Sequence, residues 1–254
     1  MKEERRKQMG ALLAQRKTMT MEELRDHFRV SMNTIRSDVA YLAETGALVK
    51  IYGGVRVANH KEVPLFAGRA TVHTSDKRGI AAAAEALIED QDIIFIDAGT
   101  TTMHLIDRLS PNKRVTVVTA NLYVIQKAVE MENVTLIVLP GTFNRRTNSL
   151  ADTGTLEFLS RYQFGKAFMG VSGVSEEGKL NVSTYLEYEI KRTVVKQSRS
   201  RFLLVDSSKF GSTGLMSYGT LSDMTSVITD ENCPEFAKDI CGVSGVALIE
   251  VKPG

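Results

Sequence analysis

A turn rich in hydroxyl groups follows an apolar run in the middle of the chain. The run covers residues 92–97, and a helix is expected over about 103–109. The turn that joins them carries Asp97, Gly99, Thr100, Thr101 and Thr102. Glycine permits a tight turn, while hydroxyls, backbone N–H groups and a helix dipole together suit a phosphate. The spacing is not that of a P-loop, and a capped helix start is the simpler alternative.

Polar residues also follow the other apolar runs of this half of the chain. If these runs are parallel strands, their carboxyl ends meet at one edge of a sheet, where ligands bind in such folds. Lys209 comes after a Ser-Ser turn, where a lysine is well placed for an anion, although a plain surface lysine is the alternative. The residues expected at this edge, besides the first turn, are Asn121, Asp152, Gly173, Glu187, Lys191 and Lys209.

A second set of polar residues has the spacing of a helix face that can enter a DNA groove. A helix is expected over about 32–45, with Ser31 as its cap. Its apolar residues Ile35, Val39 and Leu42 recur at helical spacing and must face a core. Its other face carries Asn33, Arg36, Ser37 and Ala40. Long side chains there can reach base edges or phosphates, while the small ones leave room. A merely solvated helix face is the alternative.

Short elements around this helix complete a winged helix-turn-helix. A first helix is expected over about 2–15, and Thr20 with Glu23 has the capping-box pattern of a second helix. After the third helix, two short strands surround a Tyr-Gly-Gly turn and predict a hairpin, or wing. The wing residues expected at DNA are Lys50, Tyr52 and Arg56.

The larger part of the chain alternates apolar runs with amphipathic stretches. Continuous apolar runs indicate strands that are buried on both faces, and their alternation with helices predicts a mostly parallel α/β sheet. The expected strands are 92–97, 115–119, 134–139, 167–171, 202–205, 227–229 and 246–251. The expected domains are a DNA-binding domain over 1–58, a linker over 59–75 and an α/β domain over 76–254.

The composition places the chain among ordinary globular proteins. It has 254 residues, of which 43% are hydrophobic and 24% are charged. No apolar run is long enough for a transmembrane helix, and the charged start is not a secretory signal. Cys233 and Cys241 lack the spacing of a zinc site and are expected to be buried thiols. Residues 1–60 hold 11 Lys and Arg against 7 Asp and Glu, while the remainder holds 21 against 23. The basic excess therefore lies on the segment expected to contact DNA.

Two stretches of the sequence resemble the DeoR family of bacterial transcription regulators. In residues 18–58 the likeness rests on the Val30-Ser31 turn, Thr34-Ile35-Arg36, Asp38, the segment 42–46 and the Gly-Gly wing. It implies that Thr34, Arg36 and Ser37 lie at DNA. The family usually has a second basic residue where Ser37 stands.

In residues 75–251 the likeness rests on DAGTT, Asn121, FMGVSGV, Glu187 with Lys191, and DSSKFG. It implies an effector domain related in fold to ribose-5-phosphate isomerase and glucosamine-6-phosphate deaminase. The implied effector is a phosphorylated sugar or sugar alcohol, with its phosphate near 99–102 and Lys209. The implied readers of its hydroxyls are Asp97, Asn121 and Glu187. Asp152 stands where the family usually has Gly, and Gly165 where it usually has Asp.

The leading hypothesis is a cytoplasmic repressor of a carbohydrate-utilisation operon. Its expected partners are double-stranded operator DNA and the sugar-phosphate effector, and it is expected to form a homodimer or homotetramer. No membrane contact, cofactor or metal ion is expected. The alternative is an isomerase- or deaminase-like enzyme with an appended DNA-binding domain, since Asp97, Asp152 and Glu187 are possible bases. A third hypothesis is a DNA-binding module whose sensor answers only to a partner protein.

Overall fold

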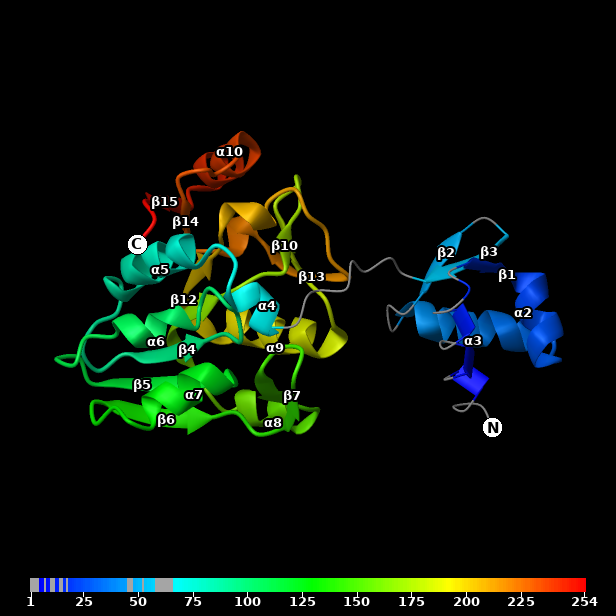
Figure 1. Ribbon diagram of the computed structural model, residues 1–254, viewed down its shortest axis with the longest axis horizontal. Helices are drawn as coiled ribbons and strands as arrows, with labels where there is room; N and C mark the ends of the chain where they lie inside the picture. The colour runs from blue at the N-terminus through cyan, green and yellow to red at the C-terminus, as the bar shows by residue number, and fades with distance from the viewer. Residues whose placement is uncertain are drawn as a thin grey trace. The chain divides into compact units, whose positions relative to one another are not determined.

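The computed structural model describes residues 5–6, 8–9, 12–13, 16, 18–44, 48–51, 53–57 and 66–254 (Figure 1). The chain divides into two compact units, Met1–Glu62 and Val63–Gly254. The segment expected as a linker lies partly outside the described residues. Its C-terminal part holds the helix α4 (Phe66–Ala70) and the start of α5 (Thr74–Glu85). These residues belong to the second unit and are not an open connector.

The first unit contains the three helical segments and the wing that the sequence predicts. The described residues between 5 and 16 are all helical, and the strand β1 (Thr18–Thr20) follows them. The helices α2 (Met21–Phe28) and α3 (Met32–Glu44) follow, then the strands β2 (Leu48–Ile51) and β3 (Gly54–Val57). The three strands form an antiparallel sheet in the order β1-β3-β2.

A small apolar core holds the first unit together. The capping box of α2 is confirmed, because the N–H of Glu23 donates to the Thr20 hydroxyl and the N–H of Thr20 donates to the Glu23 carboxylate. The residues expected to face inward from the helices are in one cluster with β1 and β3. Its buried members are Met9, Leu13, Met19, Leu24, Ile35, Val39, Leu42 and Val55. The polar face of α3 is thereby held on the outside.

The two glycines of the wing are required for different physical reasons. Gly53 has a φ of +74°, a left-handed conformation that glycine adopts without a steric cost. Gly54 pairs with Thr20 of β1, and a Cβ at this position would lie 2.5 Å from the carbonyl oxygen of Met19. The turn therefore requires one glycine for its backbone angle and the other for close approach to β1.

The second unit is built on one parallel sheet. Its seven strands are the seven that the apolar runs predict, and the fold class is confirmed. They are β4 (Ile93–Ile96), β5 (Val115–Thr119), β6 (Val134–Val138), β9 (Phe164–Met169), β12 (Ser198–Leu204), β14 (Ser226–Asp230) and β15 (Ala247–Val251). All six pairings between neighbouring strands of this sheet are parallel.

Helices cover both faces of this sheet (Figure 1). On one face lie α4, α5, α6 (His104–Arg108) and α7 (Leu122–Ala128), and on the other lie α8 (Gly154–Leu159), α9 (Tyr185–Gln197) and α10 (Glu235–Ser244). Successive strand residues point to opposite faces, so Phe95 joins one core while Ile94 and Ile96 join the other. Burial on both faces explains why the strands are continuously apolar.

Short elements lie beside the main sheet and were not predicted. The strands β7 (Thr142–Asn144) and β8 (Ser149–Ala151) form a hairpin, and β10 (Gly173–Val174), β11 (Lys179–Val182) and β13 (Met216–Thr220) form a small antiparallel sheet. Two 3-10 turns, η1 (Ser207–Lys209) and η2 (Leu221–Asp223), complete the unit. Cys233 and Cys241 are buried free thiols, as expected.

The strand order contains one point at which the direction of winding reverses. The order is β15-β14-β12-β9-β4-β5-β6, so the chain proceeds outward from β4 through β5 to β6 and then returns to β9 on the other side of β4. Loops diverge at such a point and leave a crevice at the carboxyl ends of the two strands. No helix within the described ranges is long and apolar enough to cross a membrane.

We expect Gly54→Ala to destabilise the first unit by about 1–3 kcal/mol, as overpacking typically does. The new Cβ would meet backbone atoms of β1, which cannot rotate away as a side chain can. Urea unfolding of the full chain, followed by circular dichroism, measures the effect. Gly53→Asn is the matched control, because asparagine tolerates the left-handed conformation and no atom lies within 4 Å of the new Cβ. Equal midpoints for the two variants would contradict this account of the wing.

Candidate functional site

A cavity of about 200 Å³ opens at the reversal between β4 and β9. This is far more than the roughly 10–15 Å³ that one water molecule needs. Its floor comes from the ends of β4 and β9, and α9, α4 and the β7–β8 hairpin contribute further walls. The polar residues that line it are Arg69, Asp97, Asn144, Thr147, Ser149, Ser172, Thr184, Glu187 and Lys191.

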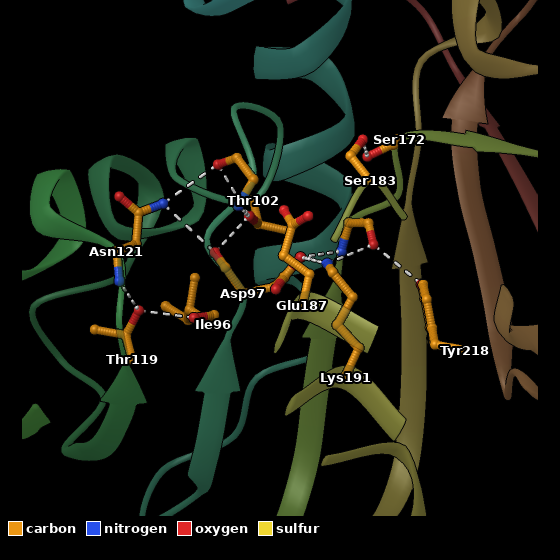
Figure 2. A network of polar contacts seen from close by, with 12 residues as sticks. Ile96, Asp97, Thr102, Thr119, Asn121, Ser172, Ser183, Glu187, Lys191 and Tyr218 are labelled. Carbon is orange, nitrogen blue, oxygen red and sulfur yellow. Dashed lines mark hydrogen bonds and ion pairs between the residues drawn. The ribbon is translucent and has the colours of Figure 1, made fainter. Parts of the chain in front are cut away.

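A buried ion pair joins the floor to α9 (Figure 2). Lys191 Nζ contacts Asp97 Oδ2 and also donates to the carbonyl of Gly170 at 2.9 Å. The same carboxylate oxygen accepts from the N–H of Gly170 at 2.9 Å. Asp97 is 4% exposed and Lys191 is 7% exposed, so each charge depends on the other for its stability. The pair ties the end of β4 to the end of β9.

Tyr218 supports this arrangement from β13. Its hydroxyl donates to the Gly170 carbonyl at 3.0 Å, and its ring centroid lies 5.5 Å from Lys191 Nζ. Burial, and then the negative charge of Asp97, raises the pKa of Tyr218 well above its usual value. The phenol therefore stays protonated and acts as a donor.

Glu187 and Thr184 hold the first turn of α9 at the rim of the cavity. The Thr184 hydroxyl accepts from the N–H of Glu187 at 3.2 Å and donates to the Glu187 carboxylate at 3.0 Å. This N-cap fixes the carboxylate in place. Ser183 donates to Ser172 at 3.3 Å, so that the β9 loop is joined to the same turn. The arrangement presents oxygen acceptors of the kind that bind hydroxyl groups.

The threonine turn is a braced loop with little hydroxyl surface left for a ligand. The Thr102 hydroxyl accepts from the N–H of Gly99 at 3.0 Å and donates to the Asp97 carbonyl at 2.8 Å. Thr100, Thr101 and Thr102 are all buried and do not line the cavity. Asp97 and Gly99 do line it, so the turn contributes its beginning to the site.

Asn121 braces this loop from the neighbouring strand. It is fully buried, and its side-chain amide lies 3.4 Å and 3.3 Å from the carbonyls of Asp97 and Gly99 (Figure 2). Its side-chain oxygen accepts from the N–H of Tyr123 and caps α7. Asn121 therefore lies beneath the cavity wall and not on it.

Three other predicted residues lie outside the cavity lining. Asp152 accepts from the N–H of Gly154, the first residue of α8, at 2.8 Å. Gly173 allows close approach to Ser212, because a Cβ there would lie 2.4 Å from that side chain. Lys209 lies half-buried in η1. Gly165, the second departure from the family pattern, lies near the amino end of β9, at the opposite edge of the sheet.

Sequence reasoning missed Arg69 and the β7–β8 hairpin. Arg69 lies in the segment expected as a linker, and the only signal there was the apolar pair at 65–66 that precedes it. The hairpin strands have three residues each, too short for a periodic pattern to be visible. Within the described ranges, no group of three or more His, Cys, Asp or Glu side chains is arranged to hold a metal ion.

The predicted DNA face of α3 is accessible in the first unit. Asn33, Arg36 and Ser37 are exposed, and Thr34 is half-buried. Ser31 acts as a cap, because its hydroxyl accepts from the N–H of Thr34 at 3.2 Å. In the wing Lys50 is exposed. Tyr52 and the side chain of Arg56 lie outside the described residues.

A buried carboxylate orients two arginines beside this face. Asp38 is fully buried and accepts from Arg5 Nε at 2.7 Å and from Arg6 Nε at 2.8 Å. Burial raises the pKa of Asp38, but the hydrogen bonds from Arg5 and Arg6 outweigh burial and hold it below its usual value. Arg5 and Asp38 line a shallow hollow together with Asn33, Thr34 and Ser37. No local pattern indicates a role for Arg5, which lies 33 positions from its partner in the sequence.

Comparison with known families gives two matches that together span most of the chain. Residues 5–61 match the DeoR-like helix-turn-helix domain, and residues 72–231 match the DeoR C terminal sensor domain.

Curated relatives align over nearly their whole length. The HTH-type transcriptional regulator IolR of Bacillus subtilis is 36% identical over 91% of this chain and 92% of its own. The glycerol-3-phosphate regulon repressor of Escherichia coli is 30% identical over 88% of each chain. The L-fucose operon activator of Haemophilus influenzae is 29% identical over 86% of this chain and 88% of its own.

Solved structures give a weaker likeness. Ribose 5-phosphate isomerase A of Methanocaldococcus jannaschii is 21% identical over 53% of each chain, with a TM-score of 0.38. The β subunit of eIF2B from Chaetomium thermophilum is 17% identical over 68% of this chain and 53% of its own, with a TM-score of 0.45.

We expect Lys191→Met to lower the free energy of unfolding of the second unit by about 3–5 kcal/mol, because it leaves the Asp97 carboxylate buried without its partner. Urea unfolding of the full chain measures the loss. Arg192→Met is the matched control on the exposed side of the same helix, and surface changes of this kind cost little. Adding Asp97→Asn to Lys191→Met should restore part of the loss. If Lys191→Met and Arg192→Met are equally stable, the ion pair does not hold the strand ends together.

Proposed function

This chain belongs to the DeoR family of transcriptional regulators, and on that premise we propose that it represses a carbohydrate-utilisation operon under the control of a phosphorylated sugar or sugar alcohol. The proposal rests on the cavity at the β4–β9 reversal, which occurs in the same chain as the exposed polar face of α3. Family membership makes the chain a regulator and not the isomerase- or deaminase-like enzyme of the alternative hypothesis.

Operator DNA is the proposed partner of the first unit. Arg36 and Asn33 extend from α3 to base edges or phosphates, Ser37 leaves space for the groove wall, and Lys50 contacts the backbone from the wing. Ser31 caps α3, and its hydroxyl lies 2.9 Å from the hydroxyl of Thr34 in the first turn of the helix. Their proposed role is to fix the end of α3 that enters the groove.

Arg5 is a proposed phosphate contact that replaces the basic residue absent at position 37. Its side chain is 20% exposed and its Nε is held by Asp38, so its guanidinium is fixed next to Ser37 in the hollow on α3. An arginine held in this way loses little side-chain freedom on binding. Asp38 accordingly acts as a positioning residue and not as a base reader.

A sugar phosphate is the proposed ligand of the cavity. The carboxylates of Glu187 and Asp97 and the hydroxyls of Ser172 and Thr184 suit the hydroxyl groups of a sugar, while the cations on the wall suit an anionic group. The E. coli relative, which is named for the glycerol-3-phosphate regulon, supports a phosphorylated effector for this chain. The effector acts by binding more tightly to the form that does not bind DNA.

The proposed active form is a homodimer or homotetramer in the cytoplasm. Two winged units on two half-sites of one operator bind far more tightly than one unit does.

We expect Arg36→Ala to weaken binding to operator DNA at least tenfold, since a good base contact is worth about 1–3 kcal/mol. Fluorescence anisotropy with an operator selected from a random-sequence library measures the loss. The salt dependence separates the two possible contacts, because loss of a phosphate contact reduces the log–log slope by about 0.9 and loss of a base contact leaves it unchanged. Arg161→Ala, an exposed arginine of the second unit, is the control. Wild-type affinity in Arg36→Ala would exclude this face of α3.

We expect a thermal-shift screen of hexose, pentose and triose phosphates to find a ligand that raises the melting temperature, because a ligand at 100 times its Kd stabilises the native state by about 2.7 kcal/mol. The same ligand should change operator affinity. Each unphosphorylated parent compound serves as the control and should shift the melting temperature less. A chain that binds its operator but responds to no phosphorylated sugar or sugar alcohol would favour the hypothesis of a sensor that answers to a partner protein.

A further inference from the structure

The cavity has two cations in its wall, and they differ in how their charge is used. Among the described residues that line it, these are Arg69 and Lys191. Lys191 is already bound to the Asp97 carboxylate and to the Gly170 carbonyl, and it is buried. A ligand could recruit this ammonium group only by breaking the pair that joins β4 to α9. The phosphate was expected near residues 99–102 and Lys209. Gly99 lines the cavity, whereas Lys209 does not.

The charge of Arg69 is compensated in a different way. The negative charges of Glu187 and Asp97 stabilise the Arg69 guanidinium and raise its pKa. Burial lowers the pKa of the Arg69 guanidinium more than these two carboxylates raise it. The guanidinium nevertheless remains charged at neutral pH, as arginine does in proteins. An anion in the cavity would therefore stabilise this half-buried cation.

The backbone of Arg69 is fixed from inside the unit. The Lys77 ammonium group donates to the Arg69 carbonyl at 2.6 Å and to the Val72 carbonyl at 2.7 Å. Lys77 is itself only 2% exposed. Phe66, at the start of α4, is buried in the core beside α5. These contacts therefore fix the backbone of Arg69 beside the cavity.

The side of α4 that faces the hairpin is joined to a second wall of the cavity. The carbonyl of Arg146, in the β7–β8 turn, accepts from the N–H of Phe66 at 3.1 Å and from Arg69 Nη2 at 3.4 Å. The hairpin in turn contributes Asn144, Thr147 and Ser149 to the lining. A ligand that contacts Arg69 thus acts on α4 and the hairpin together.

The position of α4 in the chain connects this wall to the first unit. The boundary between the two units falls between Glu62 and Val63, and α4 begins three residues after that boundary. We propose that Arg69 binds the anionic group of the effector, and that α4 is the element through which occupancy of the cavity alters DNA binding. This inference rests on the proposed function, since it assigns the anion-binding residue and the coupling element of the same site.

Arg69→Gln tests the binding step in the full-length chain by isothermal titration calorimetry. The probes are the sugar phosphate with the largest thermal shift in the screen, its unphosphorylated parent and inorganic phosphate. Arg69→Gln should bind the sugar phosphate and inorganic phosphate at least tenfold more weakly and the parent sugar as tightly as the wild type. Arg69→Lys keeps the charge without the planar fork and should recover part of the affinity, which also tests the proposal if Arg69→Gln does not fold.

Two further variants distinguish Arg69 from Lys209 as the anion-binding residue and control for the loss of a positive charge. Arg146→Gln removes an exposed arginine whose carbonyl, not its side chain, contacts α4, and it should bind as the wild type does. Lys209→Gln should also bind as the wild type does. If Lys209→Gln binds the sugar phosphate tenfold more weakly than the wild type and Arg69→Gln does not, the inference is overturned and the proposed function stands. If the wild type binds no sugar phosphate, the proposed function itself fails.

Operator binding tests the coupling step separately. With the sugar phosphate raised to saturate Arg69→Gln, the change in operator affinity seen in the wild type should be reduced at least fivefold. The quantity compared is the ratio of operator affinities with and without the ligand for each protein, so a change in ligand-free affinity does not affect the comparison. A saturated Arg69→Gln that responds as fully as the wild type would overturn the role of α4.

Discussion

The Lys191–Asp97 ion pair is the interaction on which the geometry of the second unit depends. It connects the end of β4, the end of β9 and α9, three elements that are far apart in the sequence. Two charges withdrawn from water are costly unless each has a partner and further hydrogen bonds. Gly170 supplies those bonds through both its N–H and its carbonyl. The reversal between β4 and β9 is thereby held open as a cavity with a fixed floor.

The rest of the cavity wall is built differently. The floor belongs to central strands that are buried on both faces, whereas the β7–β8 hairpin has exposed residues throughout β7. Segments with few buried contacts open at low free-energy cost. The proposed ligand would thus meet a rigid wall that fixes its orientation and a less stable wall that can respond. A sensor needs both, because only a wall with two arrangements can have different affinities for one ligand.

The sequence predicted the parts of this structure that depend on local patterns. The central strands of the main sheet are apolar runs because they are buried on both faces, and the runs were visible for that reason. The edge strands β6 and β15 are also apolar but are only partly buried. Local patterns do not predict which partner a hydroxyl group will have. The Thr102 hydroxyl was expected at a ligand, and in the structure it bonds to the backbone of Gly99 and Asp97 in its own loop. Arg69 and the hairpin were missed because their importance comes from contacts across 77 positions of sequence, which no local pattern encodes.

A buried aspartate orients cations in each unit, and the two arrangements differ in how far those cations are exposed. Asp38 holds Arg5 and Arg6, whose side chains stay 20% and 13% exposed and lie beside the accessible face of α3. Asp97 holds Lys191, which is almost completely enclosed. The first arrangement leaves positive charge at the surface, where a polyanion can reach it, and the second uses its charge to maintain the fold. The proposed role of Arg69 follows from this difference, because α4 brings a second cation to the cavity wall that is not part of the Lys191–Asp97 pair.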